Sequence, residues 1–195
     1  QDYRTANELK DMMIEFATAF AKKFNNEPNV KWMDVVNETI LPNGKWFGPK
    51  EGTNKWENPW LKIGLDKNGY PLYILKAFEI ATKHATNIKL VYNHNAGMQS
   101  IMWDKIKRSI LYIRSKGYRV DGIGWQAHLG LSSSTRAIIE NPEEELKKLS
   151  ELIDWAHNNN LEFHVTELDY FIKNNKKLAK GYQKQAEIYR KIVNV

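Results

Sequence analysis

Four short apolar runs in this sequence each end in side chains that can take part in chemistry. The runs cover residues 30–36, 88–92, 120–125 and 161–165, and each predicts a β-strand. The polar residues that follow are Asn37 and Glu38, Asn93 and His94, Gln126 and His128, and Glu167 and Asp169. Acids at the carboxyl ends of strands are typical of the mouth of a parallel sheet, where α/β enzymes keep their active sites. Glu38 and Glu167 therefore predict an acid pair.

Helical periodicity fills the intervals between these runs. Apolar residues at helical spacing predict helices over residues 6–24, from 71 onward, 101–115 and 178–193. The tripeptide Asn141-Pro142-Glu143 predicts one further helix start, with the Asn141 side chain as its cap and Pro142 in its first position. Strands that alternate with helices are joined by crossovers and form a parallel sheet.

Two α/β architectures fit this alternation, and the polar strand ends distinguish them. A doubly wound sheet concentrates its site at one switch point and usually has a glycine-rich phosphate loop, which this sequence lacks. Polar residues after consecutive strands fit a (β/α)8 TIM barrel better. Such a barrel has eight strands and about 250 residues, whereas this chain of 195 residues offers four strands. We therefore expect an α/β fold that is a partial barrel.

Composition narrows the classes of function. With 42% hydrophobic residues the chain can bury one substantial core, so we expect a single unit over residues 1–195. The net charge of +6 comes from lysines and arginines scattered among acids, so we expect no nucleic-acid partner. No run approaches the ~20 apolar residues of a membrane span, and the N-terminus has no signal-peptide pattern. The lack of cysteine excludes disulfides and thiolate metal sites.

Histidines and acids near the fourth run raise the question of a metal site. His128, His164, Glu167 and Asp169 are residue types that ligate metals. In a regular strand, however, His164 and Glu167 point to opposite faces, and no compact His-x-x-x-His spacing occurs. We therefore expect neither a metal nor another cofactor, and we assign His164 no role.

The segment Trp32-Met33-Asp34-Val35-Val36-Asn37-Glu38 resembles the acid/base strand of the glycoside hydrolase family 10 endo-xylanases, which commonly reads Trp-Asp-Val-Val-Asn-Glu. Further segments are similar to that family in order and spacing. They are the loop and helix over residues 58–78, the next strand at 89–93, the Gln-x-His strand at 121–129 and the nucleophile strand at 165–169. Each match alone is weak, but together they cover nearly the whole chain in register.

The resemblance implies a retaining endo-1,4-β-xylanase that hydrolyses internal β-1,4 bonds of xylan or xylo-oligosaccharides. Glu38 would be the acid/base and Glu167 the nucleophile, with the two carboxyl groups about 5 to 5.5 Å apart. His128 would hydrogen-bond the nucleophile, Asp169 would orient His128, and Asn37 would donate to the sugar 2-hydroxyl. The other residues that the resemblance implies around the substrate are Asn93, Gln126 and Trp46.

Aromatic residues and one departure from the family bear on how the leaving-side sugars bind. Trp46, Trp56 and Trp60 lie in the long, turn-rich stretch 37–69, either as platforms for these sugars or as loop packing, and Trp60 favours packing because it follows a proline. After Tyr92-Asn93 the family often continues Asp-Tyr-Asn, whereas this chain continues with a histidine. Leaving-side specificity therefore stays open.

The resemblance also implies that this chain is a partial catalytic domain. The first three strands of the barrel would precede Gln1 and the last would follow Val195. Expected partners are the remainder of the same polypeptide or a carbohydrate-binding module inserted before the first helix. The parent protein is expected to be secreted, periplasmic or at the cell surface. Two alternatives remain, a non-catalytic carbohydrate-binding barrel fragment and a retaining hydrolase of another β-glycan.

Overall fold

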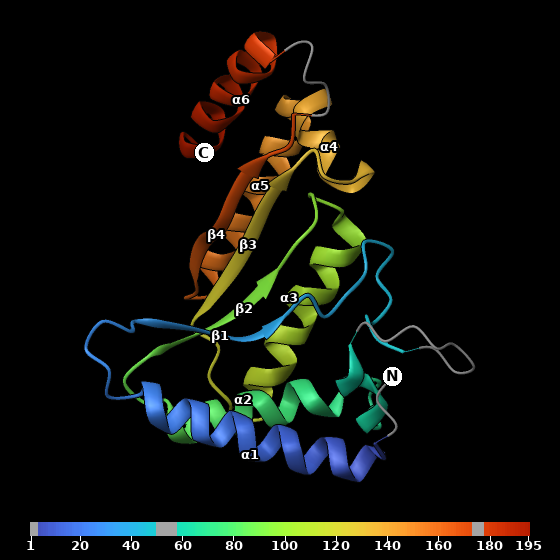
Figure 1. The fold of residues 1–195 in the computed structure, drawn as a ribbon, viewed down its shortest axis with the longest axis vertical. Helices are drawn as coiled ribbons and strands as arrows, with labels where there is room; N and C mark the ends of the chain where they lie inside the picture. Colours follow the sequence, from blue (N-terminus) through green and yellow to red (C-terminus); the bar gives the residue numbers. More distant parts are fainter. Residues whose placement is uncertain (1–3, 50–57, 173–177) are drawn as a thin grey trace.

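The computed structural model describes residues 4–49, 58–172 and 178–195. Strands and helices alternate along the chain (Figure 1). In order, the elements are α1 (Ala6–Phe24), β1 (Trp32–Asn37), the 3-10 helix η1 (Pro59–Ile63), α2 (Leu72–His84), β2 (Lys89–His94), α3 (Ser100–Ser115), β3 (Gly122–Leu129), α4 (Ser133–Glu140), α5 (Pro142–Asn158), β4 (Glu162–Tyr170) and α6 (Leu178–Val193). The helices predicted over residues 6–24 and 178–193 are confirmed to the residue.

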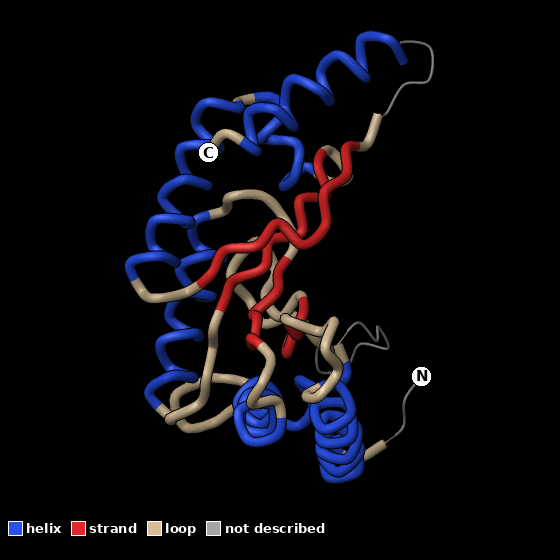
Figure 2. Tube along the Cα trace, turned by 90° about the vertical axis from the view of Figure 1, so that its left-hand side faces the viewer, coloured by secondary structure: helices blue, strands red, loops and turns tan. Residues whose placement is uncertain are grey.

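The four strands form one parallel sheet in the order β1-β2-β3-β4. Helices lie along one side of the strands (Figure 2). Between these layers the core buries alternate strand residues, such as Tyr92 and Trp125, against helix residues such as Phe78, Ile106 and Leu152. The opposite, concave face of the sheet carries polar side chains, so the fold separates a packed face from a face available for chemistry.

Each strand continues past the apolar run that predicted it. β2 ends at His94 rather than at residue 92, β3 at Leu129 rather than at 125, and β4 at Tyr170 rather than at 165. The hydrogen-bond ladder does not depend on side-chain polarity, so the strands extend through their polar residues. Consequently most of the predicted site residues lie on the strands themselves, whereas Glu38 follows β1 directly and Trp46 lies in the segment beyond it.

The start of α5 differs from the prediction. The Asn141 side chain makes no capping hydrogen bond, although Pro142 does occupy the first turn. Asn141 instead ends α4, a helix the sequence pattern did not predict, and its N–H donates to the Ala137 carbonyl at 2.7 Å. Because one residue joins two helices, its backbone angles suit the end of α4 rather than a side-chain cap on α5.

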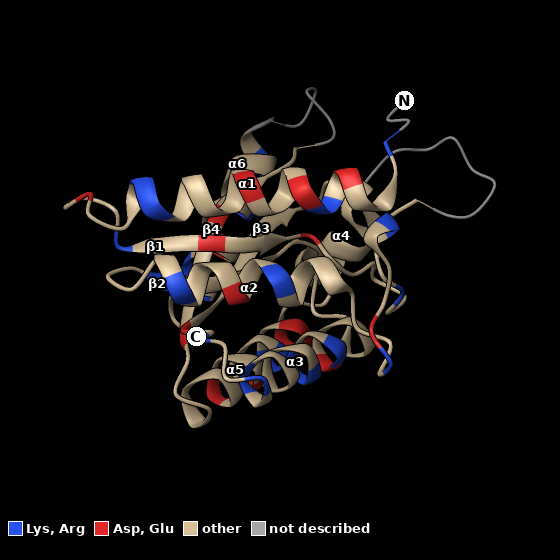
Figure 3. Ribbon diagram, turned by 90° about the horizontal axis from the view of Figure 1, so that it is seen from below, with Lys and Arg blue, Asp and Glu red and all other residues tan. Residues whose placement is uncertain are grey.

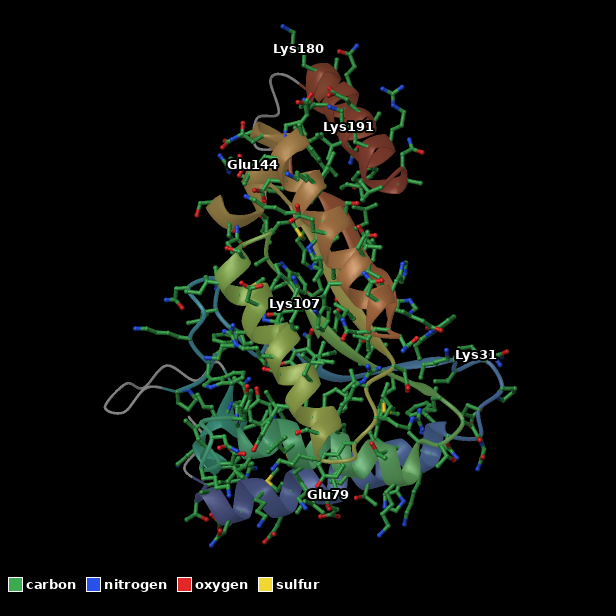
Figure 4. All side chains as sticks on the ribbon, turned by 180° about the vertical axis from the view of Figure 1, so that it is seen from behind. Lys31, Glu79, Lys107, Glu144, Lys180 and Lys191 are labelled. Atoms are coloured by element: carbon green, nitrogen blue, oxygen red, sulfur yellow. The ribbon has the colours of Figure 1, made fainter. Side chains whose placement is uncertain are left out.

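Charged side chains of both signs cover the helical side of the molecule. Seen from below, Lys and Arg lie among Asp and Glu along α1, α2 and α3 (Figure 3). In the view from behind, Lys107 lies on α3 and Glu144 on α5, both on this helical side (Figure 4). In the described ranges, none of the helices combines the length and the apolar character that crossing a membrane requires.

Candidate active site

Two β-bulges shape the concave face of the sheet. In β1 the register shifts between Asp34 and Val36, and in β4 Val165 and Glu167 pair with consecutive residues of β3, which leaves Thr166 as the extra residue. A bulge reverses the alternation of side chains beyond it and re-aims them. Asp34 and Asn37 therefore share the concave face, although they are three positions apart in the strand.

The bulge in β4 overturns the expectation that His164 and Glu167 face opposite ways. A Cβ added at Gly122 would meet the His164 ring, and His128, on the same face of β3 as Gly122, contacts Glu167. Both His164 and Glu167 therefore lie on the concave face, because the extra residue Thr166 shifts the alternation by one position. Even so, no group of three or more His, Asp or Glu suited to a metal ion occurs within residues 4–49, 58–172 and 178–195.

Three consecutive residues of β2 hold the segment that contains Glu38. The Glu38 N–H donates to the Asn93 carbonyl at 3.3 Å, Thr39 shares a hydroxyl hydrogen bond with Tyr92, and the Ile40 N–H donates to His94 Nε2 at 3.1 Å. The Glu38 backbone has a φ of 52°, an unfavourable angle for a residue with a side chain, and these bonds maintain it. Glu38 is half-buried, and its carboxylate accepts no hydrogen bond from the described residues.

His94 is a structural residue of this segment that the sequence pattern did not identify. Its ring is fully buried, and burial lowers its pKa to about 4. A neutral ring suits both contacts, since Nδ1–H donates to the Asn95 carbonyl at 3.0 Å while Nε2 accepts from Ile40. The only sequence signal was a polar residue at the end of an apolar run. His94 therefore supports the Glu38 segment.

The structure joins Glu167, His128 and Asp169 in one hydrogen-bonded chain. His128 Nε2 lies 2.8 Å from Glu167 Oε2, and Nδ1 lies 2.8 Å from Asp169 Oδ2. Burial lowers the pKa of His128, but the hydrogen bonds and charges of Asp169 and Glu167 outweigh this and hold the pKa above its ordinary value. A doubly protonated ring donates to both carboxylates at once, so it fixes Glu167 in place and stabilises its negative charge.

Asn37, Asn93 and Gln126 form a second network on the same face. The Asn37 Oδ1 atom accepts two hydrogen bonds, from Gln126 Nε2 at 2.7 Å and from Asn93 Nδ2 at 3.2 Å. With its oxygen occupied, Asn37 turns its amide nitrogen the other way, and no described residue accepts from that nitrogen. Asn37 can therefore donate to a ligand.

Asp34 is a further acid on this face that the sequence pattern did not identify. Desolvation raises its pKa, the nearby negative charge of Glu167 raises it further, and His164 acts in the opposite direction. Asp34 lies on β1 and Glu167 on β4, the two outer strands of the sheet. The curvature of the sheet thus brings its two edges within electrostatic range of each other.

Two tryptophans of the long segment after β1, Trp46 and Trp60, have different surroundings. The Trp46 ring lies between this segment and α3: its N–H donates to the Gly69 carbonyl at 2.9 Å, and the Lys105 ammonium of α3 lies 4.0 Å from the ring centre. No described contact joins it to the networks above. Trp60, by contrast, lines a cavity of about 580 Å³ together with Glu38 and Phe16 of α1. Trp56 lies outside the described residues.

Comparison with known proteins agrees with this geometry. The curated endo-1,4-beta-xylanase A of Thermoanaerobacterium saccharolyticum is 30% identical over 193 residues, which are 96% of this chain and 14% of that protein. The exoglucanase XynX of Acetivibrio thermocellus is 29% identical over 193 residues, with 96% and 15% covered. An intracellular xylanase of T. saccharolyticum, solved with xylotetraose, superposes with a TM-score of 0.67 at 23% identity over 97% of this chain and 51% of that one.

The comparisons also define what this sheet belongs to. This chain spans about half the length of the solved relative and a smaller share of the two curated ones. Its four parallel strands and their helices are part of a (β/α)8 TIM barrel, as expected. The family model of glycosyl hydrolase family 10 matches residues 1–195. The chain therefore belongs to glycosyl hydrolase family 10.

Proposed function

We propose that this chain carries the catalytic residues of a retaining endo-1,4-β-xylanase. The observation that carries the proposal is the contrast between its two glutamates. The Glu167 carboxylate is held and stabilised as an anion by His128, whereas the Glu38 carboxylate has no hydrogen-bond donor among the described residues. A nucleophile must stay ionised and in place, while an acid/base must gain and lose a proton, so the two environments match two different roles.

The reaction follows from these roles. A Glu167 oxygen attacks the anomeric carbon as the bond to the leaving sugar breaks, and Glu38 gives its proton to the leaving oxygen. Water then attacks the same carbon, Glu38 takes the proton of that water, and the bond to Glu167 breaks. Two inversions at one carbon give a product with the original β-configuration. Asn37 donates from its free amide nitrogen to the sugar 2-hydroxyl, a contact that strengthens in the transition state.

Xylan is the proposed substrate because of the relatives. One is named an endo-1,4-beta-xylanase, and another was solved with xylotetraose bound. The exoglucanase name of a third relative favours a second candidate, a retaining hydrolase of another β-glycan. Initial rates on xylan, xylo-oligosaccharides, cello-oligosaccharides and mixed-linkage glucan separate the two. Faster cleavage of the glucans would overturn the assignment to xylan.

Covalent trapping tests the mechanism. An aryl 2-deoxy-2-fluoro-β-xylobioside slows the second step, so a retaining enzyme accumulates the glycosyl-enzyme, which intact mass and peptide mapping then locate. We expect the label on Glu167, no label on Glu167→Gln, and normal labelling of Glu162→Gln, a matched change in the same strand. A label on a different residue, or an α-configured first product by NMR, would contradict the proposal.

A further inference from the structure

Thr166, the extra residue of the β4 bulge, makes a contact that no assigned role explains. Its hydroxyl donates to the Asn93 Oδ1 atom on β2 at 2.9 Å, across the intervening strand β3. Without the bulge, Thr166 and Glu167 would point to opposite faces. Because of the bulge, two adjacent residues of β4 both lie on the concave face. Glu167 contacts His128, and Thr166 contacts Asn93.

Asn93 passes this contact on to Asn37. Asn93 is only 2% exposed, so both ends of its side-chain amide must find partners within the protein. Its oxygen accepts from Thr166, and its nitrogen donates to Asn37 Oδ1 at 3.2 Å. A threonine hydroxyl that donates to Asn93 therefore determines which end of the Asn93 amide faces Asn37.

Gly124 leaves the space that this contact needs. A Cβ at this position of β3 would lie 2.4 Å from Asn93 Oδ1 and 2.9 Å from the Thr166 methyl carbon. Both distances are too short for ordinary packing, so even alanine would push the two side chains apart. A glycine between Asn93 and Thr166 is thus a requirement of the contact.

We propose that Thr166 is a positioning residue for Asn37, acting through Asn93. Its hydroxyl orients the Asn93 amide, the Asn93 nitrogen holds the Asn37 oxygen, and the Asn37 nitrogen is left to donate to a sugar hydroxyl. If Asn93 turned over, its oxygen would face the Asn37 oxygen, and Asn37 would lose a donor that keeps its own amide in place. The relay itself is a property of the fold, while its effect on sugar rests on the proposed function.

Side-chain amide NMR tests the relay without needing activity. In the ¹⁵N-labelled chain, the NH₂ signals of Asn37 and Asn93 are assigned by their loss in Asn37→Asp and Asn93→Asp. Thr166→Val keeps the shape but removes the hydroxyl, so both NH₂ pairs should move or split. Thr166→Ser keeps the hydroxyl and should retain the wild-type signals. Thr82→Val is the matched control. Thr82 lies on α2, where its hydroxyl accepts from the Arg119 N–H, so its loss should leave the NH₂ signals of Asn37 and Asn93 in place.

The outcomes of this measurement are decisive. An unchanged Asn37 pair in Thr166→Val would overturn the proposal. Gly124→Ala provides a second variant, since its Cβ would meet Asn93 and Thr166 first and should displace these two side chains. If Thr166→Val does not fold, Gly124→Ala decides: moved Asn37 signals support the relay, and unmoved signals refute it.

Kinetics on xylo-oligosaccharides test the consequence for sugar. Thr166→Val should lower kcat/KM about tenfold, Thr166→Ser should restore most of it, and Asn37→Ala should cost on the order of 100-fold. Because Thr166 acts through Asn37, the double variant should be no worse than Asn37→Ala alone. Fully multiplicative losses would contradict the relay. Absence of cleavage by the unmodified chain would count against the proposed function alone, since the amide signals still judge the relay.

Discussion

The two ends of the concave face use similar residues in opposite ways. At the amino ends of the strands, the Glu162 carboxylate accepts from Trp32 Nε1 at 2.7 Å and His164 Nε2 at 3.1 Å and forms an ion pair with Lys89. We call these four residues the floor. Every one of them is satisfied by another, so the floor is closed on itself.

At the carboxyl ends of the strands the networks are left open. We call Asn37, Glu38, His128, Glu167 and Asp169 the rim. The Glu38 carboxylate and the Asn37 amide nitrogen have no hydrogen-bond partner in the described part of the chain, and a bulge precedes the rim residues on both β1 and β4. Two regions with similar residues thus differ in function, so composition alone does not mark an active site. Closed networks stabilise a barrel, and open ones leave groups for substrate.

The largest effect should come from the rim glutamates. Glu167→Ala should lower xylan cleavage by more than about 1,000-fold, because the proposed covalent intermediate forms on this carboxylate. Glu38→Ala should impair substrates with poor leaving groups far more than aryl glycosides, since only the former need protonation. Initial rates on xylan and on a dinitrophenyl xylobioside measure both. Glu162→Gln in the floor is the control. If it lowered the rate of cleavage as much as the rim variants do, the two regions would not differ in function.

The next effect concerns His94, which lies beside the rim but serves stability. Its pKa is about 4 in the fold and about 6.5 when exposed. The unfolded chain therefore binds more protons below pH 6.5, and His94 costs about 3 kcal/mol of stability as the pH falls from 6.5 to 4. Urea unfolding at pH 7 and pH 4 checks this in the unmodified chain and in His94→Gln. The stability advantage of the unmodified chain should shrink by about that amount in acid, and an advantage independent of pH would show that His94 is not held neutral.

The contrast between floor and rim also shows how far the sequence could be interpreted. Apolar runs and helical spacing were enough to predict the parallel sheet, because strands and helices that pack against each other must carry apolar residues at these spacings. The family motif led to Glu38, Glu167, His128 and Asp169, and the structure brings the last three into contact. Strand ends were placed too early, since backbone pairing continues through polar residues.

The bulges could not be predicted. An inserted residue in a strand changes the register without changing the composition, so Thr166 and Asp34 had no signal in the sequence. For the same reason the prediction that His164 and Glu167 point to opposite faces was wrong. Trp46 remains a predicted substrate residue, although its described contacts include Gly69 in the same segment and Lys105 on α3. Side-chain contacts between distant residues depend on how neighbouring strands are aligned. Hydrophobic periodicity does not predict that alignment.

A smaller effect should follow from removing the charge that supports His128. In Asp169→Asn the loss of the negative charge should lower the pKa of His128, which the two carboxylates now hold above its ordinary value. His128 then loses its proton at a lower pH, so the alkaline limb of the kcat/KM profile should shift to lower pH. At pH 8 we expect a loss of about 10- to 100-fold, and less at pH 5.5. Asp104→Asn, a surface change on α3, should leave the profile unchanged, whereas an unshifted limb in Asp169→Asn would separate His128 from the nucleophile.

The smallest effect should come from the floor. The hydrogen bonds from Lys89 and then Trp32 lower the pKa of Glu162 to about 2, so this carboxylate stabilises the fold above pH 4.5 and loses that effect as the pH falls toward 2. Lys89 and Glu162 are both exposed enough for solvent to weaken their attraction. Lys89→Met should therefore lower Tm at pH 7 by at most about 2 °C, reduce acid stability slightly, and leave kcat/KM unchanged. A tenfold loss of activity in this variant would show that the floor reaches the substrate through Asp34 and Glu167, and the division between a closed and an open end of the sheet would then fail.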